Sequence, residues 1–565
     1  MAIVTTNLHE FGPQNAACSS GITAQDDTNL LDEDGNALCM EEGGFEFKMS
    51  ITGSSFKLEL PAQTGYPDYT PLTYSFTVDW GDGNTDIITA YDQTEVTHSY
   101  SVSGTYIVSI DGVCESLDYG GSTHRSKINS ITQWGDVGFT YMYQAFDSCY
   151  NMGITATDTP KFSGMTDVRY MFQNTEVTTG AENWDFTGIT DISGMFYQCT
   201  NFQSDCSGWT GMGGITNMYR TFSYCERFNS SIANWDTSAV TIWQETFFFC
   251  DDFNHSSIQD LDVSAGVNFV RMLSFAQSLT QPLPWTFQNV LPIDMTAMFR
   301  SCDDFNGDIS GWDVSAVTTM NSMFEDCFSF NQDLLLWDTG NVVDFGYWMD
   351  SSFGTFYGVF AGDVSNFDTS SCTSMSNMFR NQDVFNSDLS GWDVSNVTDM
   401  SDMFYKCYIF DSDLTLWNVE KVTDMSGMFF WNFAFNGNVV AWNPIACTDM
   451  TSMFALCDLF NQDISGWNVS SVTNMTSMFQ GALDFDQDIS SWDVDGTTVT
   501  NMLSGANLFS TANYDLLLNG WAAHTVATSQ TFTVTPAYTI VTSQTARDTL
   551  TNAPNNWTIT DGGGI

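Results

Sequence analysis

Tryptophan recurs in this chain at intervals of 25 residues, and this period constrains the fold more than any other feature. The most regular stretch runs from Trp392 through Trp417, Trp442 and Trp467 to Trp492. A fixed period of about 20–50 residues is typical of repeat architectures, in which each unit buries its apolar face only against its neighbours. With degenerate copies included, we expect about 16 such units between residues 120 and 525.

Apolar side chains stand at fixed offsets from each tryptophan: Phe at −7, Ile or Leu at −3, Val at +2 and +5, Met at +8 and +11, and Phe at +12. These offsets match neither a sustained helix nor an alternating strand, so they predict a short coil with several corners. Equivalent residues then stack. The regular tryptophans form one column, and Cys407 and Cys457 belong to a second column of free thiols, because in-register stacking rarely provides disulfide geometry. Zinc is not expected, because the cysteines lack C-x-x-C spacing and nearby histidines.

Period-two alternation replaces the 25-residue period ahead of the array, in segments such as 74–80 and 105–110. Gly, Pro and Asp turns separate these segments, which is the pattern of a small antiparallel sandwich. We therefore divide the chain into an arm (1–44) that could anchor the protein, a sandwich (45–116), the repeat array (117–525) and a cap (526–565). The predicted fold class is mostly β.

The charge balance is strongly acidic, with 14 Lys and Arg against 68 Asp and Glu, a formal net charge of −54. Such a surface repels phosphate, so nucleic acid and anionic membranes are excluded as expected partners. Divalent cations, Ca²⁺ above all, are natural counterions. No apolar run approaches about 18 residues, so no transmembrane segment is expected.

The repeat Phe460-Asn-Gln-Asp-Ile-Ser-Gly-Trp-Asn-Val-Ser-Ser-Val-Thr-Asn-Met-Thr-Ser-Met-Phe479 resembles the BspA-like leucine-rich repeats of bacterial surface proteins, in the 25-residue variant called DUF285. The resemblance implies a leucine-rich-repeat solenoid with a role in adhesion or partner binding. The segments Val78-Asp-Trp-Gly-Asp-Gly-Asn84 and His98-Ser-Tyr100 resemble a PKD domain, which implies an immunoglobulin-like sandwich. Related repeats also occur in phage genomes.

Two groups of acidic residues are candidate Ca²⁺ ligands. One is the loop that holds Asp79, Asp82, Asn84 and Asp86, where oxygen ligands surround a glycine turn. The other group consists of two aspartate rows in the repeats, at offsets −4 and +1 from the tryptophan. Asp388 and Asp413 represent the row at −4. The alternative for both groups is turn capping by aspartate side chains. Acid–base catalysis needs two carboxylates in unlike environments, whereas a uniform row supplies identical environments. The rows therefore argue against a glycosidase.

The 25-residue pattern breaks down between residues 344 and 360, where aromatic residues accumulate. Aromatic side chains outside the pattern are candidate anchors for a binding partner. Insertions that pack on the side of the stack are the alternative. The candidate binding residues are Tyr347, Trp348, Phe353, Phe356 and Tyr357.

These features predict a non-enzymatic structural and recognition protein at an extracellular or virion surface. The first residues contain no basic segment followed by an apolar one, so we expect no signal peptide. This favours a phage virion appendage that contacts protein or glycan on a host, or neighbouring virion subunits. The alternatives are a secreted bacterial adhesin and, more remotely, a carbohydrate-active enzyme.

Overall fold

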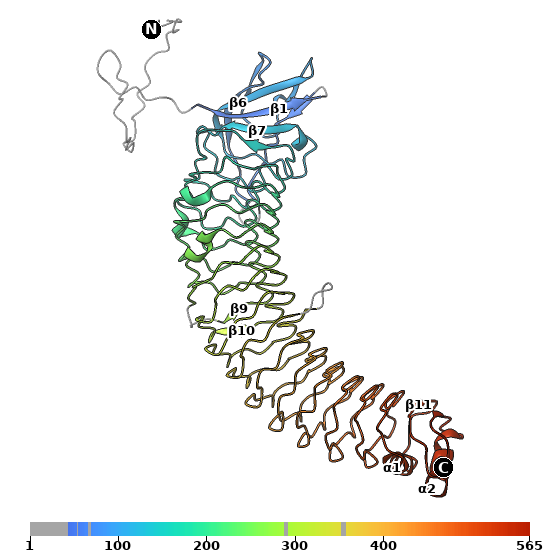
Figure 1. The fold of residues 1–565 in the computed structure, drawn as a ribbon. Helices are drawn as coiled ribbons and strands as arrows, with labels where there is room; N and C mark the ends of the chain where they lie inside the picture. The colour runs from blue at the N-terminus through green and yellow to red at the C-terminus, as the bar shows by residue number, and fades with distance from the viewer. Residues whose placement is uncertain (1–42, 53–54, 66–68, 288–291, 352–357) are drawn as a thin grey trace, which may run out of the picture.

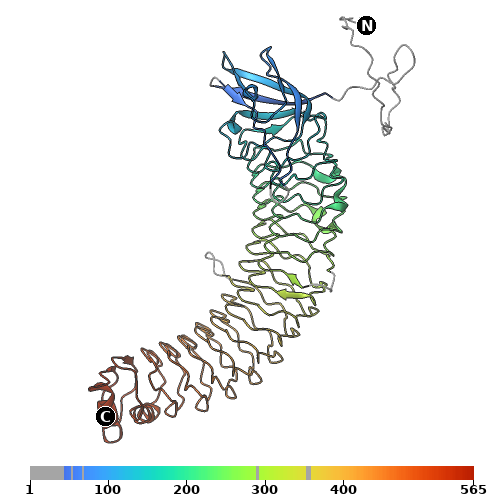
Figure 2. The same cartoon turned by 180° about the vertical axis from the view of Figure 1, so that it is seen from behind.

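The computed structural model describes residues 43–52, 55–65, 69–287, 292–351 and 358–565. The chain forms a sheet at one end and then winds into a long, curved stack of coils (Figures 1 and 2). Strand, turn and irregular backbone predominate, and the two α-helices of the described part both lie near the C-terminus. The mostly β, repetitive character predicted from the sequence is thus confirmed.

The N-terminal sheet has six strands in the order β4-β3-β6-β1-β7-β8. Strand β1 pairs with β6 on one side and with β7 on the other, both antiparallel. Since β7 and β8 lie beyond residue 116, the sheet continues directly into the first coils. The resemblance to a PKD domain stays a prediction. The strands are β1 Phe45–Ile51, β3 Tyr74–Asp79, β4 Thr85–Ile88, β6 Gly104–Cys114, β7 Ile128–Gln133 and β8 Gly153–Ile154, with β2 Ser55–Lys57 and β5 Thr97–Ser99 as a separate antiparallel pair.

Successive coils pair mainly through single parallel bridges rather than through long strands. One column of bridges passes from Asp399 to Asp424, Asp449 and Asn474, seven residues after each tryptophan position. A short parallel pair, β9 Ile293–Asp294 and β10 Val317–Thr319, lies in the same column. Single-turn 3-10 helices interrupt the coils or precede them, at Thr94–Val96, Arg125–Lys127, Cys206–Gly208, Met212–Gly214 and Ser256–Asp260.

The tryptophans form a buried column in which the rings stack between neighbouring coils, and other apolar residues such as Leu261 and Phe367 take the tryptophan position in some coils. Trp442 lies between Trp417 and Trp467, with ring centroids 6.2 and 5.8 Å away. Its indole Nε1 donates to the carbonyl oxygen of Leu414 in the preceding coil at 2.9 Å. The same bond recurs 28 residues apart for Trp392, Trp417, Trp467 and Trp492. In these five coils the buried indole N–H group therefore forms a hydrogen bond with the preceding coil.

A second column consists of phenylalanine and cysteine. Phe404 contacts Phe429 in the next coil, with centroids 5.6 Å apart. The Cys407 thiol donates to the carbonyl oxygen of Phe379 at 3.0 Å, and Cys457 donates to Phe429 at 2.8 Å. All twelve cysteines in the described residues are free and buried. Burial raises the pKa of the Cys407 and Cys457 thiols. They pack as small apolar groups.

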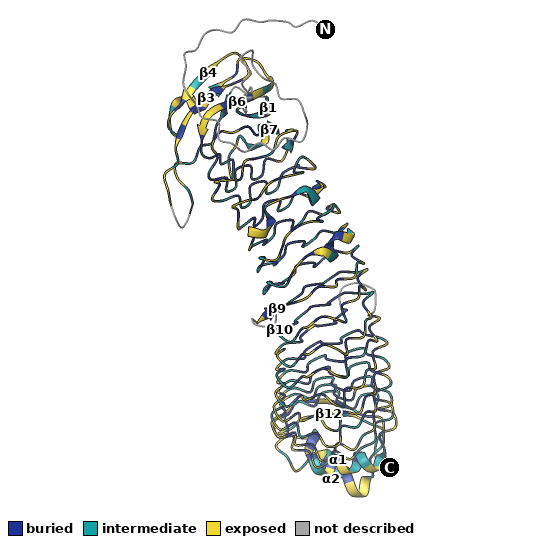
Figure 3. Ribbon diagram, turned by 90° about the vertical axis from the view of Figure 1, so that its left-hand side faces the viewer, coloured by how far each residue is buried: buried dark blue, intermediate teal, exposed yellow. Residues whose placement is uncertain are grey.

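The corner that follows the bridge column contains two left-handed residues in most coils, four positions apart. In one coil these are Asp402 (φ 53°) and Lys406 (φ 58°). Met403 and Phe404 between them are buried, whereas Asp402 and Lys406 themselves are partly exposed. Figure 3 shows exposed residues recurring at the edges of the coils along the whole stack.

The C-terminal end closes on the helices α1 (Thr511–Trp521) and α2 (Ile540–Thr551) and on a parallel pair of strands, β11 (Thr531–Thr533) and β12 (Thr558–Thr560). Ser510 is the N-cap of helix α1, and its side chain accepts a hydrogen bond from the Asn513 amide. It buries Leu517, Leu518 and Trp521 against the last coil. The apolar columns are thereby covered at this end.

Candidate interaction surface

The predicted aromatic binding site is only partly described by the structure. Tyr347 is 41% exposed, but Trp348 is completely buried. Trp348 stands eleven residues after Trp337, at a methionine position of the repeat, and contacts Phe345, Phe360 and other core rings. This corrects the prediction that Trp348 is an exposed anchor. Three predicted residues, Phe353, Phe356 and Tyr357, lie outside the described residues.

The predicted Ca²⁺ loop uses its carboxylates for internal hydrogen bonds. Asp79 accepts from the Gly81 amide at 2.8 Å, and Asp86 accepts from the Trp80 indole at 2.8 Å. Asp82 accepts from Asn84 and contacts His98 Nε2 at 2.9 Å. Both carboxylate oxygens of Asp82 therefore have partners within the protein.

The aspartate rows also cap turns. Asp388 Oδ1 accepts from the Ser390 amide at 3.0 Å, and Asp413 Oδ1 accepts from the Thr415 amide and hydroxyl at 3.0 and 2.5 Å. The Thr415 hydrogen bonds lower the pKa of Asp413. Each carboxylate bonds within its own turn, which is the alternative that the sequence left open.

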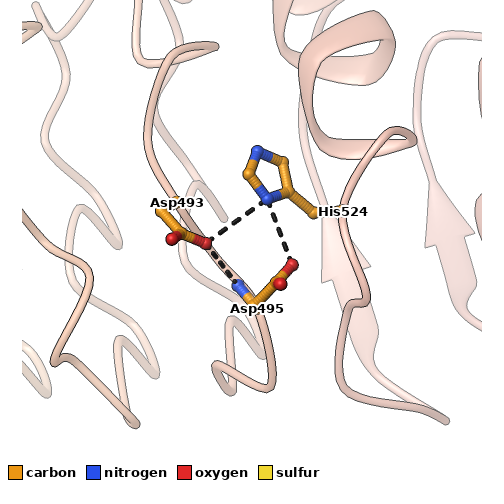
Figure 4. Close-up of side chains that lie close together, drawn as sticks. All are labelled: Asp493, Asp495 and His524. Carbon is orange, nitrogen blue, oxygen red and sulfur yellow. Dashed lines mark hydrogen bonds and ion pairs between the residues drawn. The ribbon is translucent and has the colours of Figure 1, made fainter.

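One three-residue cluster was missed by the sequence analysis. Asp493, Asp495 and His524 bring ligand atoms within 4.8 Å of one another, and no other His, Cys, Asp or Glu group of three does so among the described residues (Figure 4). His524 Nδ1 lies 3.3 Å from Asp493 and 3.1 Å from Asp495. Ca²⁺ prefers oxygen ligands, so a nitrogen-containing set does not match the predicted cofactor. These contacts join the last coil to the segment that follows α1.

In each coil, the residue immediately before the buried phenylalanine at offset −7, or before its equivalent, lies on the surface. We call the row of these residues the outer row. Backbone hydrogen bonds keep it in register: the Asp252 amide donates to Glu226 at 3.0 Å, and the Leu508 amide donates to Leu483 at 3.0 Å. Up to residue 329 its members are all polar: Asn151, Glu176, Asn201, Arg227, Asp252, Ser278, Asp304 and Ser329. From residue 359 onward they are apolar with one exception: Val359, Val384, Ile409, Ala434, Leu459, Asp484 and Leu508.

The apolar part of the outer row is exposed and is widened by the residues beside it. Ile409 is 48% exposed, Leu459 50% and Leu508 61%. Phe433 and Leu483, one position earlier in their coils, are also exposed. We call the following six residues the apolar patch: Val384, Ile409, Phe433, Leu459, Leu483 and Leu508.

An aromatic cluster adjoins this patch across two coils. Tyr405 stacks on Phe430 with centroids 4.8 Å apart, and Tyr408 stacks on Phe433 at 5.4 Å. Trp431 contacts Phe433 at 6.4 Å. Lys406 Nζ lies 5.4 Å from the centroid of the Tyr405 ring and 5.1 Å from that of Trp431. Since all of these side chains are at least partly exposed, they form a surface feature.

The sequence analysis did not identify the apolar patch or the aromatic cluster, although both can be recognised in the sequence once the repeats are aligned on the buried phenylalanine.

Among the described residues, no helix is long and apolar enough to span a bilayer.

Comparisons with known proteins identify one family. The model of the family described as "Mycoplasma protein of unknown function, DUF285" matches five consecutive segments, at residues 120–213, 211–293, 284–352, 348–439 and 430–538. No curated protein and no solved structure matches this chain. Because the five matches together extend over most of the chain and follow its repeats, the chain belongs to the DUF285 family of repeat proteins.

Proposed function

We propose that this protein is a non-enzymatic recognition protein at an extracellular or virion surface, and that its coils present a docking surface to a partner. The observation on which this proposal rests is the outer row, which is apolar in six of the seven coils from residue 359 to residue 508 and exposed in five of them. A contiguous apolar surface of this kind on a strongly acidic protein is characteristic of interaction sites. The repeat family supports the surface assignment.

The proposal includes a finer description of the fold, namely a leucine-rich-repeat solenoid preceded by a PKD-type sandwich. Coils held together by equivalent tryptophan, phenylalanine and cysteine columns support the solenoid. In a solenoid each coil contacts only its neighbours, so the surface extends over many coils and suits a large partner.

Immunogold labelling tests the surface location. Antibodies raised against the coils are applied to intact cells that produce the protein and to any particles released from them. We expect label on the outer surface of particles if the protein is a virion appendage, and on the cell surface if it is an adhesin. Label that appears only after the cells are permeabilised would contradict the proposal.

A further inference from the structure

We propose that the apolar patch and the adjoining aromatic cluster form one docking surface for a partner protein that presents apolar side chains surrounded by basic ones. The inference rests on the proposed function and specifies the chemistry of the partner.

The first support is the continuity of the apolar patch. Stacked Phe385, Phe410, Phe435 and Phe460, with centroids 5.8 to 6.1 Å apart, hold successive coils in register directly beneath it. The Ala434 amide donates to Tyr408 at 3.2 Å, which fixes the outer row against the preceding coil. Side chains 38% to 61% exposed therefore follow one another along a fixed line. Burying such a line against a partner is favourable at roughly 25 cal/mol per Å² of apolar surface.

The aromatic cluster supplies the residue types that dominate binding energy at protein interfaces. Tryptophan and tyrosine are enriched among such residues, and they contribute most where neighbours exclude water from them. Trp431 and Tyr405 have this arrangement, because Phe430 contacts both rings. Lys406 and Arg380 lie over the Tyr405 ring and hold it in place.

The charge around the patch identifies the partner's rim as basic. The coils that form this surface, residues 359–508, contain 19 Asp and Glu against 3 Lys and Arg. Asp383 and Asp458 immediately precede the patch residues Val384 and Leu459. Burial raises the pKa of both carboxyl groups. Basic side chains at the rim of a partner would complement this acidic surface.

Other occupants fit less well. A second copy of the chain would bring another formal charge of −54 against the same acidic surface. Glycans bind through free ring faces and polar groups, whereas Tyr405 and Tyr408 each have one face covered by a neighbouring ring and the patch is largely aliphatic. A protein segment with apolar and basic side chains matches both properties of the surface.

Three synthetic helical peptides serve as probes: one amphipathic peptide of leucine and lysine, one with glutamate in place of lysine, and one with serine in place of leucine. Binding to the full chain is measured by fluorescence anisotropy at several salt concentrations. The test variant combines Ile409→Ser with Leu459→Ser. The matched control combines Leu336→Ser with Leu416→Ser, which are 77% and 78% exposed but lie outside the patch.

We expect the leucine–lysine peptide to bind best, the test variant to weaken it at least about tenfold and the control to change it less than about twofold. Equal binding of the serine–lysine peptide, or full binding by the test variant, would show that charge alone attracts the probe and would overturn the inference. Equal binding of the leucine–glutamate peptide would overturn the basic rim. Sedimentation that shows a dimer dissolved by the test variant, or glycan-array binding lost in it, would assign the surface to another occupant.

Surface labelling and peptide binding fail independently. Label at the surface with no patch-dependent binding would retain the proposed function and remove the docking surface. Patch-dependent binding by a protein found only inside cells would do the reverse.

Discussion

Coils 151–329 and coils 359–508 have nearly the same interior and different surfaces. In both stretches buried phenylalanines stack at centroid distances near 6 Å, as in the pairs Phe305–Phe330 and Phe435–Phe460. Yet the outer row is entirely polar in the first stretch and mostly apolar in the second. The repeat thus fixes the columns that each coil must share with its neighbours. It leaves the outward positions free to differ, so a polar outer row and an apolar one are both compatible with the same core.

The two stretches also differ in how many basic residues they contain. Residues 151–329 contain 6 Lys and Arg against 21 Asp and Glu, and residues 359–508 contain 3 against 19, so the net charges are similar and the second stretch has fewer bases. In the first stretch the buried Glu245 contacts Arg220 at 2.6 Å and Arg271 at 3.7 Å, and Arg300 contacts Glu325 at 2.8 Å. Three acidic groups there, Asp167, Glu245 and Glu325, are paired with arginine within the molecule. The second stretch has few bases to pair with its acids.

Truncation of a stacked tryptophan should test whether the two interiors are equivalent. Trp312→Ala and Trp442→Ala each remove a buried ring and its indole hydrogen bond, to Leu283 at 2.7 Å and to Leu414 at 2.9 Å. We expect each to cost about 3–5 kcal/mol of local stability, measured by hydrogen exchange of the surrounding coils. Local exchange is required because repeat arrays do not always unfold as one unit.

Equal losses at the two sites would support a common interior. A loss at Trp312 that exceeds the loss at Trp442 by more than about twofold would contradict it. The two stretches would then differ in their interiors as well as at their surfaces.

The interior was also the part most accessible to prediction. The period places Trp392 to Trp492 in one column, and Phe367 at a tryptophan position stacks between Trp337 and Trp392. Trp348 was assigned to the surface because aromatic residues on either side obscured its register, although its distance from Trp337 fits a core position. Residue type misled where spacing was informative.

Glu245→Gln should test the internal pairing of the first stretch. The variant keeps the shape of the side chain but leaves Arg220 and Arg271 without a carboxylate. Since these side chains are 34% and 48% exposed, water compensates in part, and we expect a loss of about 1–2 kcal/mol in the hydrogen exchange of this region. Glu226→Gln, at an exposed position, is the control and should stay within about 0.5 kcal/mol. A loss as large at Glu226 would show that charge balance, not pairing, matters there.

An asparagine that links coils should behave alike in both stretches. Asn306 Oδ1 accepts from the Asn331 amide and Asn461 Oδ1 from the Asp486 amide, both at 2.9 Å. We expect Asn306→Ala and Asn461→Ala each to cost about 1 kcal/mol. Asn461→Asp retains the acceptor and should cost less, because Asp411 occupies the same position in another coil and accepts from the Asn436 amide. Differential hydrogen exchange at these amides measures the effect, and equal losses for the Ala and Asp variants would contradict it.

The surface could be predicted less completely than the interior. Aspartates at 388 and 413 suggested either cations or turn caps, and only coordinates show that each accepts from its own turn. The cluster of Asp493, Asp495 and His524 depends on how α1 returns the chain to the last coil, which no spacing reveals. The outer row was readable in principle. It was missed because isolated exposed leucines and valines are ordinary, and only their alignment over many coils is informative.

The burial of Asp402 in the second stretch predicts a pH-dependent gain in stability from Asp402→Asn. Burial raises the pKa of Asp402 above its ordinary value of 3.8, and the attraction of Arg380 offsets this only in part. The folded chain thus binds the proton more tightly than the unfolded chain, so stability is lost as the pH rises through the raised pKa. Asparagine carries no charge at any pH and tolerates the left-handed backbone. The variant should therefore melt at a higher temperature than the native chain at pH 7, with the difference disappearing below about pH 4.

Asp413→Asn provides the opposite case in the same stretch. The pKa of Asp413 is lowered by its hydrogen bonds to Thr415, so its charged form favours the folded state above the unfolded pKa. Its replacement should give no gain at pH 7 and a small loss that vanishes as the pH falls. Melting curves of both variants between pH 3 and pH 7 decide the matter. A gain of equal size for both would mean that relief of the overall negative charge, rather than burial at one corner of the coil, governs stability in these coils.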